Sequence, residues 1–427
     1  MVVIGAGVIG LCLARALSAR GWRVTVVERG EAGDGASRGN AGWVVPGRTA
    51  PVPGPGVVGT TLRSLRDPAA PLALRPSASP AYLRWLVDFW RHCNARDHAA
   101  GLAATAALNV DTLALFDRLR ADGVAFESAE TDILYAYRSA PHLERDLAGL
   151  AAITTEGSVQ PVPMTGDALR EREPALRDEV VGGYRLVAQR WVRPETLVAG
   201  LVADLRERGV EVRSQTRVTG FDRSSAGVAA VRTPQGPIAG DAVVLCAGVA
   251  TADLARMLGV RLPIQAGKGY SLDYSPAPRS VTNVLYLDEA RLAVTPFAGT
   301  LRVAGLMDLS SPGDAMPPAR PCQVAAAAAD YLRDWPTDPA RATAWTGMRP
   351  LTPDGLPAIG RLPGVPNVAV AAGHAMLGIT LAPATAEALA ELLSGGDETD
   401  PDVLAPFDPT RFVRRMPPHL KVAAKRA

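Results

Sequence analysis

The feature that most constrains this 427-residue chain is its first stretch, MVVIGAGVIGLCLARALSARGWRVTVVER. An apolar run from Met1 to Ile4 meets three glycines, at Gly5, Gly7 and Gly10. A helical pattern of apolar residues follows, and a second apolar run, Val24 to Val27, comes after it. The stretch therefore predicts a strand, a glycine-rich turn, a helix and a second strand.

Each of the three glycines has its own physical reason in a nucleotide-binding turn. Gly5 allows the tight turn after the strand, Gly7 lets a pyrophosphate approach the backbone, and Gly10 lets the helix pack closely on the sheet. Backbone N–H groups at the start of the helix then face the phosphates. Glu28, at the end of the second strand, is placed to accept hydrogen bonds from a ribose hydroxyl. We therefore expect a dinucleotide site; the alternative is a Rossmann-like unit that binds no nucleotide.

Composition and charge limit the class of protein. The chain is long enough for two domains with separate cores, and its net charge of +2 gives no general attraction to nucleic acid. The four cysteines show no C-x-x-C spacing, so free thiols in a reducing compartment are favoured over a disulfide or a metal site. We expect no metal and no nucleic-acid partner.

The apolar segments do not predict a membrane protein. The N-terminus lacks the basic residues of a signal peptide, and its glycines are accounted for by the nucleotide turn. The alanine-rich run from Gly101 to Phe116 is interrupted by Asn109 and Asp111, so we expect no run as long as a transmembrane helix. A cytoplasmic protein with at most peripheral membrane contact is the expectation.

The rest of the chain alternates between two patterns. After Glu28 comes a glycine-rich loop, GEAGDGASRGNAGWVVPG, in which Ser37, Arg38 and Asn40 offer donors to a ligand. Residues 82–154 predict two helices, then strands over 124–137, then a helix over 142–154. Beyond them we expect a helix over 194–208, buried strand 242–246, a period-two antiparallel sheet over 263–306, and a last helix over 378–393.

Six segments together make the chain resemble the flavin-dependent D-amino acid oxidase superfamily, and within it the bacterial D-amino acid and D-hydroxyproline dehydrogenases. These segments are GAGVIG with Glu28, SRGNAGWVVPG, VVLCAG, GKGYSL, TGMRPLTPDGLPAIGR and GHAMLGITLAPATA. The resemblance implies an α/β fold with an α+β insertion: a Rossmann-like FAD-binding domain interleaved with an antiparallel-sheet substrate (cap) domain. It places the FAD-binding domain in residues 1–57, 190–260 and 342–410, the cap domain in 58–189 and 261–341, and a basic tail in 411–427.

The resemblance also implies which residues bind a non-covalent FAD. No cysteine lies near Gly347, close to where sarcosine oxidase relatives carry a covalent flavin link. The implied cofactor-binding residues are Gly5, Ala6, Gly7, Val8, Ile9, Gly10, Glu28, Arg29, Ser37, Arg38, Asn40, Ala41, Gly42, Trp43, Val44, Val218, Ala247, Gly248, Gly373, His374, Met376, Leu377, Gly378, Ile379 and Thr380.

The GHAMLGIT segment would bring a helix N-terminus to the pyrimidine end of the flavin. Free N–H groups of Gly378, Ile379 and Thr380, with the positive end of the helix dipole, would stabilise the negative charge of the reduced flavin. Without the resemblance, the start of a helix with a chance histidine is the favoured interpretation of the segment. His374 is either a pocket liner, a structural donor or a proton-transfer group.

Arg349, in the segment Gly347-Met348-Arg349-Pro350, is the expected substrate ligand, because the family uses this arginine to hold the substrate carboxylate. A planar guanidinium gives two parallel hydrogen bonds to a carboxylate and so fixes its orientation. The residues alone also allow a surface arginine before a proline-rich loop. Where the family often has an assisting tyrosine this chain has Ala293, and Tyr270 is a possible substitute.

The implied reaction is hydride transfer from the α-carbon of a D-amino acid to flavin N5, giving an imino acid and then a 2-oxo acid, or a cyclic product from substrates such as D-proline or D-hydroxyproline. Electrons would leave to a quinone, a carrier protein or oxygen, since the chain has one dinucleotide fingerprint only. The alternatives are a glycine- or sarcosine-type amine oxidase using oxygen, an NAD-dependent dehydrogenase, and a flavin electron-transfer subunit of a larger complex.

Overall fold

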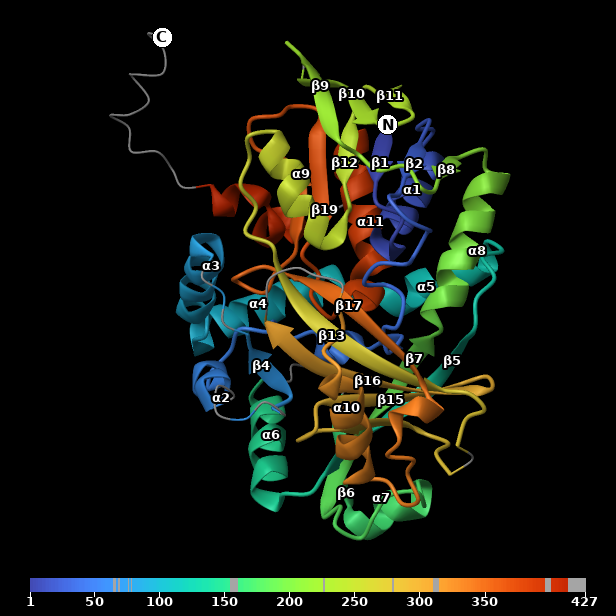
Figure 1. The fold of residues 1–427 in the computed structure, drawn as a ribbon, viewed down its shortest axis with the longest axis vertical. Helices are drawn as coiled ribbons and strands as arrows, with labels where there is room; N and C mark the ends of the chain where they lie inside the picture. Colours follow the sequence, from blue (N-terminus) through green and yellow to red (C-terminus); the bar gives the residue numbers. More distant parts are fainter. Residues whose placement is uncertain are drawn as a thin grey trace.

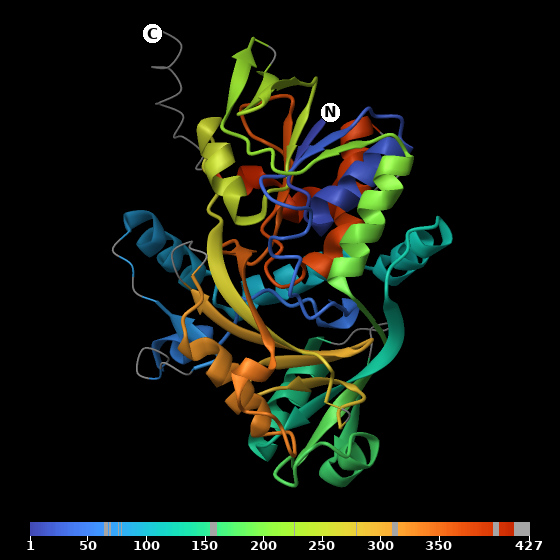
Figure 2. The same cartoon turned by 45° about the vertical axis from the view of Figure 1, so that its right-hand side comes forward.

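The protein is described here by a computed structural model that covers residues 1–63, 67, 70–75, 77, 79–153, 160–225, 227–278, 280–309, 315–395 and 401–413. A six-stranded and a three-stranded sheet occupy the upper region in Figure 1, and a ten-stranded sheet occupies the lower region. Each region draws on segments that are far apart in the sequence (Figure 2). The predicted α/β fold with an inserted α+β part is confirmed.

The six-stranded sheet contains the N-terminal strand and has the order β18-β19-β12-β1-β2-β8. Five of its strands run parallel and β18 runs antiparallel to β19. The strands are apolar along their length because both faces of the sheet are covered. Their bounds are β1 (Val2–Ile4), β2 (Thr25–Val27), β8 (Glu211–Arg213), β12 (Val243–Leu245), β18 (Ala358–Arg361) and β19 (Val368–Ala372).

Alternate side chains of β1 pack on different layers. Val3 belongs to a core with three helices on one face, whereas Val2 and Ile4 belong to a core with α9 and the three-stranded sheet on the other. The elements of these layers are α1 (Val8–Ala19), α8 (Pro194–Glu207) and α11 (Gly378–Ser394) on the first face, and β9 (Gly220–Ser224), β10 (Gly227–Thr233), β11 (Gly236–Ala239) and α9 (Thr251–Met257) on the second.

The ten-stranded sheet is largely antiparallel and has the order β17-β13-β16-β15-β14-β5-β7-β3, with β4 paired to β16 and β6 to β7. Four of its strands are those that the period-two pattern predicts between residues 263 and 306. The bounds are β3 (Trp43–Val44), β4 (Leu72–Leu74), β5 (Ser128–Tyr137), β6 (Pro161–Thr165), β7 (Gly182–Val192), β13 (Gln265–Tyr274), β14 (Val284–Leu287), β15 (Leu292–Phe297), β16 (Thr300–Leu309) and β17 (Thr343–Leu351).

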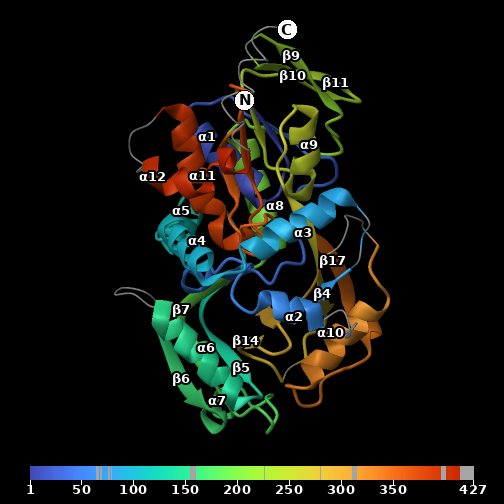
Figure 3. The same ribbon diagram turned by 90° about the vertical axis from the view of Figure 1, so that its left-hand side faces the viewer.

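Helices of the inserted part lie beside and between the two regions (Figure 3). They are α2 (Val57–Arg63), α3 (Pro80–Arg91), α4 (Ala95–Leu108), α5 (Thr112–Ala121), α6 (Ala140–Ile153) and α7 (Gly166–Arg172), while α10 (Ala319–Ala329) and α12 (Pro401–Leu404) come later in the chain.

One helical stretch in the described part of the chain, Ala95–Ala121, is long and apolar enough to cross a membrane by length and composition. The expectation that no run reaches this length was therefore wrong on composition. The structure nevertheless ends α4 at Leu108 and begins α5 at Thr112. The break lies at Asn109 and Asp111, which interrupt the apolar run, and the core faces of both helices pack in the interior. The sequence predicts two helices between residues 82 and 123, whereas the structure has three there, because the second is divided into α4 and α5.

The predicted domain segments can be compared with the strands of the two regions. All strands of the six-stranded sheet lie in residues 1–57, 190–260 and 342–410. However, β3 and β17, which also lie in these segments, hydrogen-bond to the ten-stranded sheet. The FAD-binding segments thus contribute strands to both regions. Within the predicted basic tail, residues 414–427 lie outside the described residues.

Candidate active site

The turn between β1 and α1 accepts glycine only, for reasons of space. A Cβ at Gly5, where φ is +112°, would lie 2.5 Å from the carbonyl oxygen of Cys246. A Cβ at Gly10 would lie 1.9 Å from the carbonyl oxygen of Gly5. At the start of α1, Gly7 is the N-cap and has no side chain to cap the helix. The turn therefore starts α1 without a side chain on its N-cap residue, as the close approach of a pyrophosphate to the helix start requires.

The carboxylate of Glu28 spans this turn. It accepts hydrogen bonds from the backbone N–H of Ala6 (2.9 Å) and of Gly30 (3.1 Å). Ser37 lies on the other side of the turn, where its hydroxyl accepts a hydrogen bond from the N–H of Val8 (3.1 Å). Residues predicted from separate motifs thus meet at one point of the sheet edge.

The carboxyl end of β12 lies at the same edge. Leu245 is in register with Ile4 of β1, so Ala247 and Gly248 follow β12 beside the glycine turn. Gly248 has a φ of +55° and begins a short 3-10 helix, Gly248–Ala250. Val218 is partly buried against the core on that face of the sheet. Ligands of open α/β sheets bind at such carboxyl ends.

The loop from Asn40 to Val44 links the two regions. The guanidinium of Arg302, on β16, donates to the carbonyl oxygen of Asn40 (2.9 Å). Thr295, on β15, donates to the carbonyl of Ala41 (2.8 Å) and accepts from the indole N–H of Trp43 (2.9 Å). The loop is therefore clamped by the ten-stranded sheet.

The start of α11 also contacts the loop from Asn40 to Val44. The hydroxyl of Thr380 donates to the carbonyl oxygen of Trp43 (3.0 Å). The N-cap of α11, Leu377, makes no side-chain capping bond, so N–H groups of its first turn remain for a ligand. Before it, Gly373 has a φ of +93°, and a Cβ there would lie 2.7 Å from Thr352.

Three predicted cofactor residues have exposed side chains that lie outside these contacts. Arg29 is exposed, and Arg38 is an exposed partner of Asp34 (2.9 Å). Met376 is 47% exposed. Their side chains make no contact with the glycine turn among the described hydrogen bonds and ion pairs.

His374 is held in the interior beside the predicted substrate arginine. An isolated β-bridge pairs His374 with Leu351, which lies two residues after Arg349. The Nε2 atom of His374 lies 3.1 Å from the hydroxyl of Thr385. Burial lowers the pKa of His374 to about 3. The imidazole is therefore neutral at physiological pH, which favours a structural role over proton transfer.

Arg349 is a guanidinium without a counter-charge among the described residues. It lies on β17, and its Nη1 donates to the carbonyl oxygen of Leu306 (2.8 Å). Space for it exists because residue 269 is glycine, where a Cβ would lie 2.3 Å from Cζ of Arg349. Burial lowers the pKa of the guanidinium to about 10, partly offset by Tyr286 and Tyr270. Since Arg349 remains partly exposed, it can still receive an anion.

Two tyrosines, Tyr286 and Tyr270, partly offset the lowering of the pKa of Arg349 by burial. Tyr286 was not predicted from the sequence. Tyr270, the predicted substitute, is buried, and its hydroxyl donates to Asp308 (2.7 Å). Tyr286 lies on β14 directly opposite Ala293, the position where the family often has a tyrosine. Cross-strand register brings it there, and only a correct pairing of VLYLDE with RLAVTPF could have indicated it.

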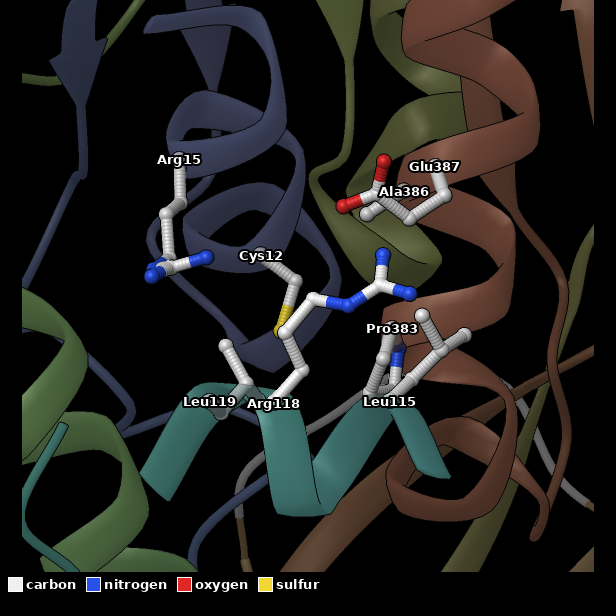
Figure 4. A pocket seen from close by; sticks show the side chains of 8 residues that line it. All are labelled: Cys12, Arg15, Leu115, Arg118, Leu119, Pro383, Ala386 and Glu387. Atoms are coloured by element: carbon white, nitrogen blue, oxygen red, sulfur yellow. The ribbon is translucent and has the colours of Figure 1, made fainter. Parts of the chain in front are cut away.

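Two hollows elsewhere in the described structure are lined by none of the predicted site residues. One, of about 20 Å³, lies between α1, α5 and α11, with Cys12, Arg118 and Glu387 on its walls (Figure 4). Burial raises the pKa of the Cys12 thiol to about 12, so this thiol is not reactive. The other, of about 310 Å³, lies between α8 and the loop at Glu31.

Comparison with known proteins assigns the family. The model of the family described as FAD dependent oxidoreductase (DAO) matches residues 1–392. The chain belongs to this family. FAD is accordingly the cofactor. The glycine turn, the carboxylate of Glu28 and the two helix starts whose N-cap residues make no side-chain bond fit an FAD.

The curated relatives of this family member include a D-amino acid dehydrogenase of Cereibacter sphaeroides, 33% identical over 92% of this chain and 92% of that protein. A D-amino acid dehydrogenase of Rhizorhabdus wittichii is 32% identical over 92% of this chain and 96% of its own length. Among solved structures, glycine oxidase from Geobacillus kaustophilus has a TM-score of 0.74 at 23% identity, covering 96% of this chain and 98% of its own. L-proline dehydrogenase from P. horikoshii has a TM-score of 0.70 at 20% identity, with 96% of each chain covered.

Proposed function

We propose that this FAD-dependent oxidoreductase is a D-amino acid dehydrogenase that oxidises the bond between the α-carbon and the amine nitrogen. The observation that carries the proposal is the partly buried guanidinium of Arg349, which has no carboxylate partner among the described ion pairs. A substrate carboxylate supplies the missing charge, and the planar fork fixes its orientation. The names of the curated relatives support the D-amino acid class.

FAD supplies the redox chemistry when bound, by accepting the hydride that leaves the α-carbon. The protein's part is to bind and orient. Arg349 holds the carboxylate, and Tyr286 partly offsets the lowering of its pKa by burial and so helps to keep the guanidinium charged. The clamped loop from Asn40 to Val44 and the first turn of α11 provide N–H groups and a helix dipole for the negative charge that reduction creates.

No side chain has to accept a proton if the substrate amine is neutral, since its lone pair then assists departure of the hydride. His374 fits this reading, because burial keeps it neutral and Thr385 occupies its Nε2. The product is an imino acid, which water converts to a 2-oxo acid and ammonia, or a cyclic imine when the amine is part of a ring. We further propose that the electrons pass to a quinone, a carrier protein or oxygen, that FAD is not covalently bound, and that the protein is cytoplasmic with at most peripheral membrane contact.

A substrate panel tests the proposal. The FAD-loaded protein is mixed without oxygen with D-amino acids, their L-enantiomers, D-proline, D-hydroxyproline, glycine and sarcosine, and loss of the flavin absorbance near its visible maximum is followed. Rapid bleaching by D-amino acids and not by their L-enantiomers is expected. Bleaching by glycine or sarcosine alone, or by L-enantiomers at equal rates, would contradict it.

A further inference from the structure

A second guanidinium, that of Arg48, packs on an aromatic layer of the ten-stranded sheet. Arg48 ends the short 3-10 helix Pro46–Arg48, which follows β3 and the clamped loop. Its Cζ lies 5.1 Å from the centre of the Tyr135 ring, within the range of a cation–π contact. Arg48 therefore belongs to the ten-stranded sheet by contact, although its segment starts in the dinucleotide region.

The aromatic layer connects the two arginines. Tyr135 on β5 is paired in register with Tyr286 on β14, and the ring centres are 5.1 Å apart. Trp43 meets Tyr286 edge-on at 5.9 Å. Tyr286 is paired with Ala293 on β15, which is paired with Ala304 on β16. Two residues further along β16, the carbonyl oxygen of Leu306 accepts the hydrogen bond from Arg349. Three rings thus lie in one layer of the ten-stranded sheet, with Arg48 over Tyr135 and Arg349 bound to β16, two strands from Tyr286.

The donors of Arg48 are only partly used. The nearest carboxylate, that of Asp146, is 3.6 Å from Nη2, which is longer than a hydrogen bond. The same carboxylate oxygen already accepts hydrogen bonds from the hydroxyls of Tyr137 and Tyr184. The Arg48 side chain is 23% exposed, so it is not sealed in the interior.

Arg302 shows what an arginine with a structural role looks like in the same sheet. Its side chain is 3% exposed, and it makes two hydrogen bonds of 2.7 Å to the carboxylate of Asp273. It also donates to Glu195 (2.7 Å). Unlike Arg302, Arg48 therefore keeps guanidinium N–H groups that can bind a ligand.

We infer that Arg48 determines substrate specificity by donating a hydrogen bond to an oxygen at the end of the substrate side chain. The inference rests on the proposed function, because it takes the carboxylate of the amino acid to lie on Arg349. The rings of Trp43, Tyr135 and Tyr286 would line the path between the two guanidinium groups. Since Asp146 already lies near Arg48, the oxygen need not be charged, and amide and carboxylate side chains both qualify.

Matched substrates test this inference. Anaerobic flavin reduction is measured with D-glutamine, D-glutamate and D-norleucine, which share a chain length and differ in the terminal oxygen. For the wild type, the reduction rate divided by half-saturation should favour the two oxygen-bearing substrates over D-norleucine by about tenfold or more, the effect of one hydrogen bond to a charged donor. In Arg48→Met this preference should disappear, mainly through higher half-saturation for D-glutamine, and Arg48→Lys should restore part of it.

Arg120→Met is the control, because Arg120 also lies over an aromatic ring, that of Phe126 (5.8 Å), but on α5. It should leave the preference unchanged. Equal preference in the wild type and Arg48→Met would overturn the inference while leaving the proposed function intact. No reduction by any D-amino acid would instead overturn the proposed function.

A binding measurement covers the case in which Arg48→Met does not fold. Glutarate and valerate, which differ by one terminal carboxylate, are titrated into the oxidised wild-type protein and followed by the flavin absorbance shift. Glutarate should bind about tenfold more tightly, because only it reaches both guanidinium groups. Equal affinities would contradict the role of Arg48.

Discussion

The two regions of the molecule offer different kinds of groups to a ligand. In the six-stranded region the binding groups are mostly backbone N–H groups, exposed by glycines and by helix starts without side-chain caps. In the ten-stranded region the binding groups are side chains, and several charged residues are buried there, including Arg302, Asp308 and Arg320. The first region therefore depends on absent side chains, and the second on charges whose partners must stay in place.

The largest effect is expected from filling the space that glycine leaves in the first region. In Gly10→Ala the new Cβ would meet the backbone of Gly5, so α1 must move away from β1 and the phosphate site is lost. We expect protein purified without FAD, scored by its visible absorbance. Gly35→Ala, at a glycine with nothing within 4 Å, should retain FAD. Full FAD content in Gly10→Ala would remove the steric basis of the comparison.

The second region should instead be sensitive to loss of a charge. Asp308 is 1% exposed and holds Arg320, which is 0% exposed, together with the hydroxyl of Tyr270. Asp308→Asn leaves Arg320 without its counter-charge, and breaking a buried pair in this way costs about 3–5 kcal/mol. Urea unfolding of the wild type and variant measures it.

Asp330→Asn is the matched control, because its partner Arg138 is 3.5 Å away and the Asp330 side chain is 63% exposed. Exposed pairs contribute about 1 kcal/mol or less. Similar losses of stability in the two variants would show that burial does not distinguish these charges.

A smaller effect is expected from Glu28, the one carboxylate among the predicted cofactor-binding residues. Glu28→Gln weakens its bonds to Ala6, Gly30 and the expected ribose, and hydrogen bonds to charged groups contribute about 1.5–3 kcal/mol. The dissociation constant of FAD should rise about tenfold or more, by titration of the FAD-free protein. Glu31→Gln, in the same loop, should leave it unchanged, and an unchanged constant in Glu28→Gln would contradict the ribose assignment.

The smallest effect concerns pH. His374 has a pKa of about 3 in the folded protein because it is buried, against about 6.5 when unfolded. Between these values the unfolded chain binds a proton that the folded chain does not, so the free energy of unfolding falls as pH falls, by up to about 1.4 kcal/mol per pH unit. Urea unfolding at pH 7, 6 and 5 should show a weaker fall in His374→Gln. Identical slopes in both proteins would contradict a buried neutral histidine.

The same difference between the regions explains what the sequence could predict. The glycine turn, Glu28 and Ser37 were readable because backbone-built sites leave local spacing and composition in the chain. The break between α4 and α5 was not predicted, although Asn109 and Asp111 interrupt the apolar run there. Tyr286 was not, because its position opposite Ala293 depends on the pairing of two strands. The partner of Tyr270, Asp308, also lies on another strand, and no local pattern indicates it.

The strands β3 and β17 were assigned to the FAD-binding segments, yet they pair with the ten-stranded sheet. A sequence pattern gives the strand, but the sheet that it joins is decided by tertiary packing. Arg349 lies on β17, so the residue most important for the proposed function belongs to the FAD-binding segments by sequence and to the cap sheet by hydrogen bonding.

The most direct test of the account is anaerobic stopped-flow reduction of the flavin by the best D-amino acid, as a function of its concentration, in the wild type, Arg349→Lys and Arg349→Ala. Lysine keeps the charge and loses the fork, so half-saturation should rise and the limiting rate should fall, since a misplacement of about 1 Å can cost on the order of a hundredfold. Alanine should be worse, FAD should remain bound in both variants, and Arg341→Ala, an exposed arginine before β17, should behave as the wild type. Equal half-saturation and limiting rates in all four proteins would contradict the carboxylate role of Arg349.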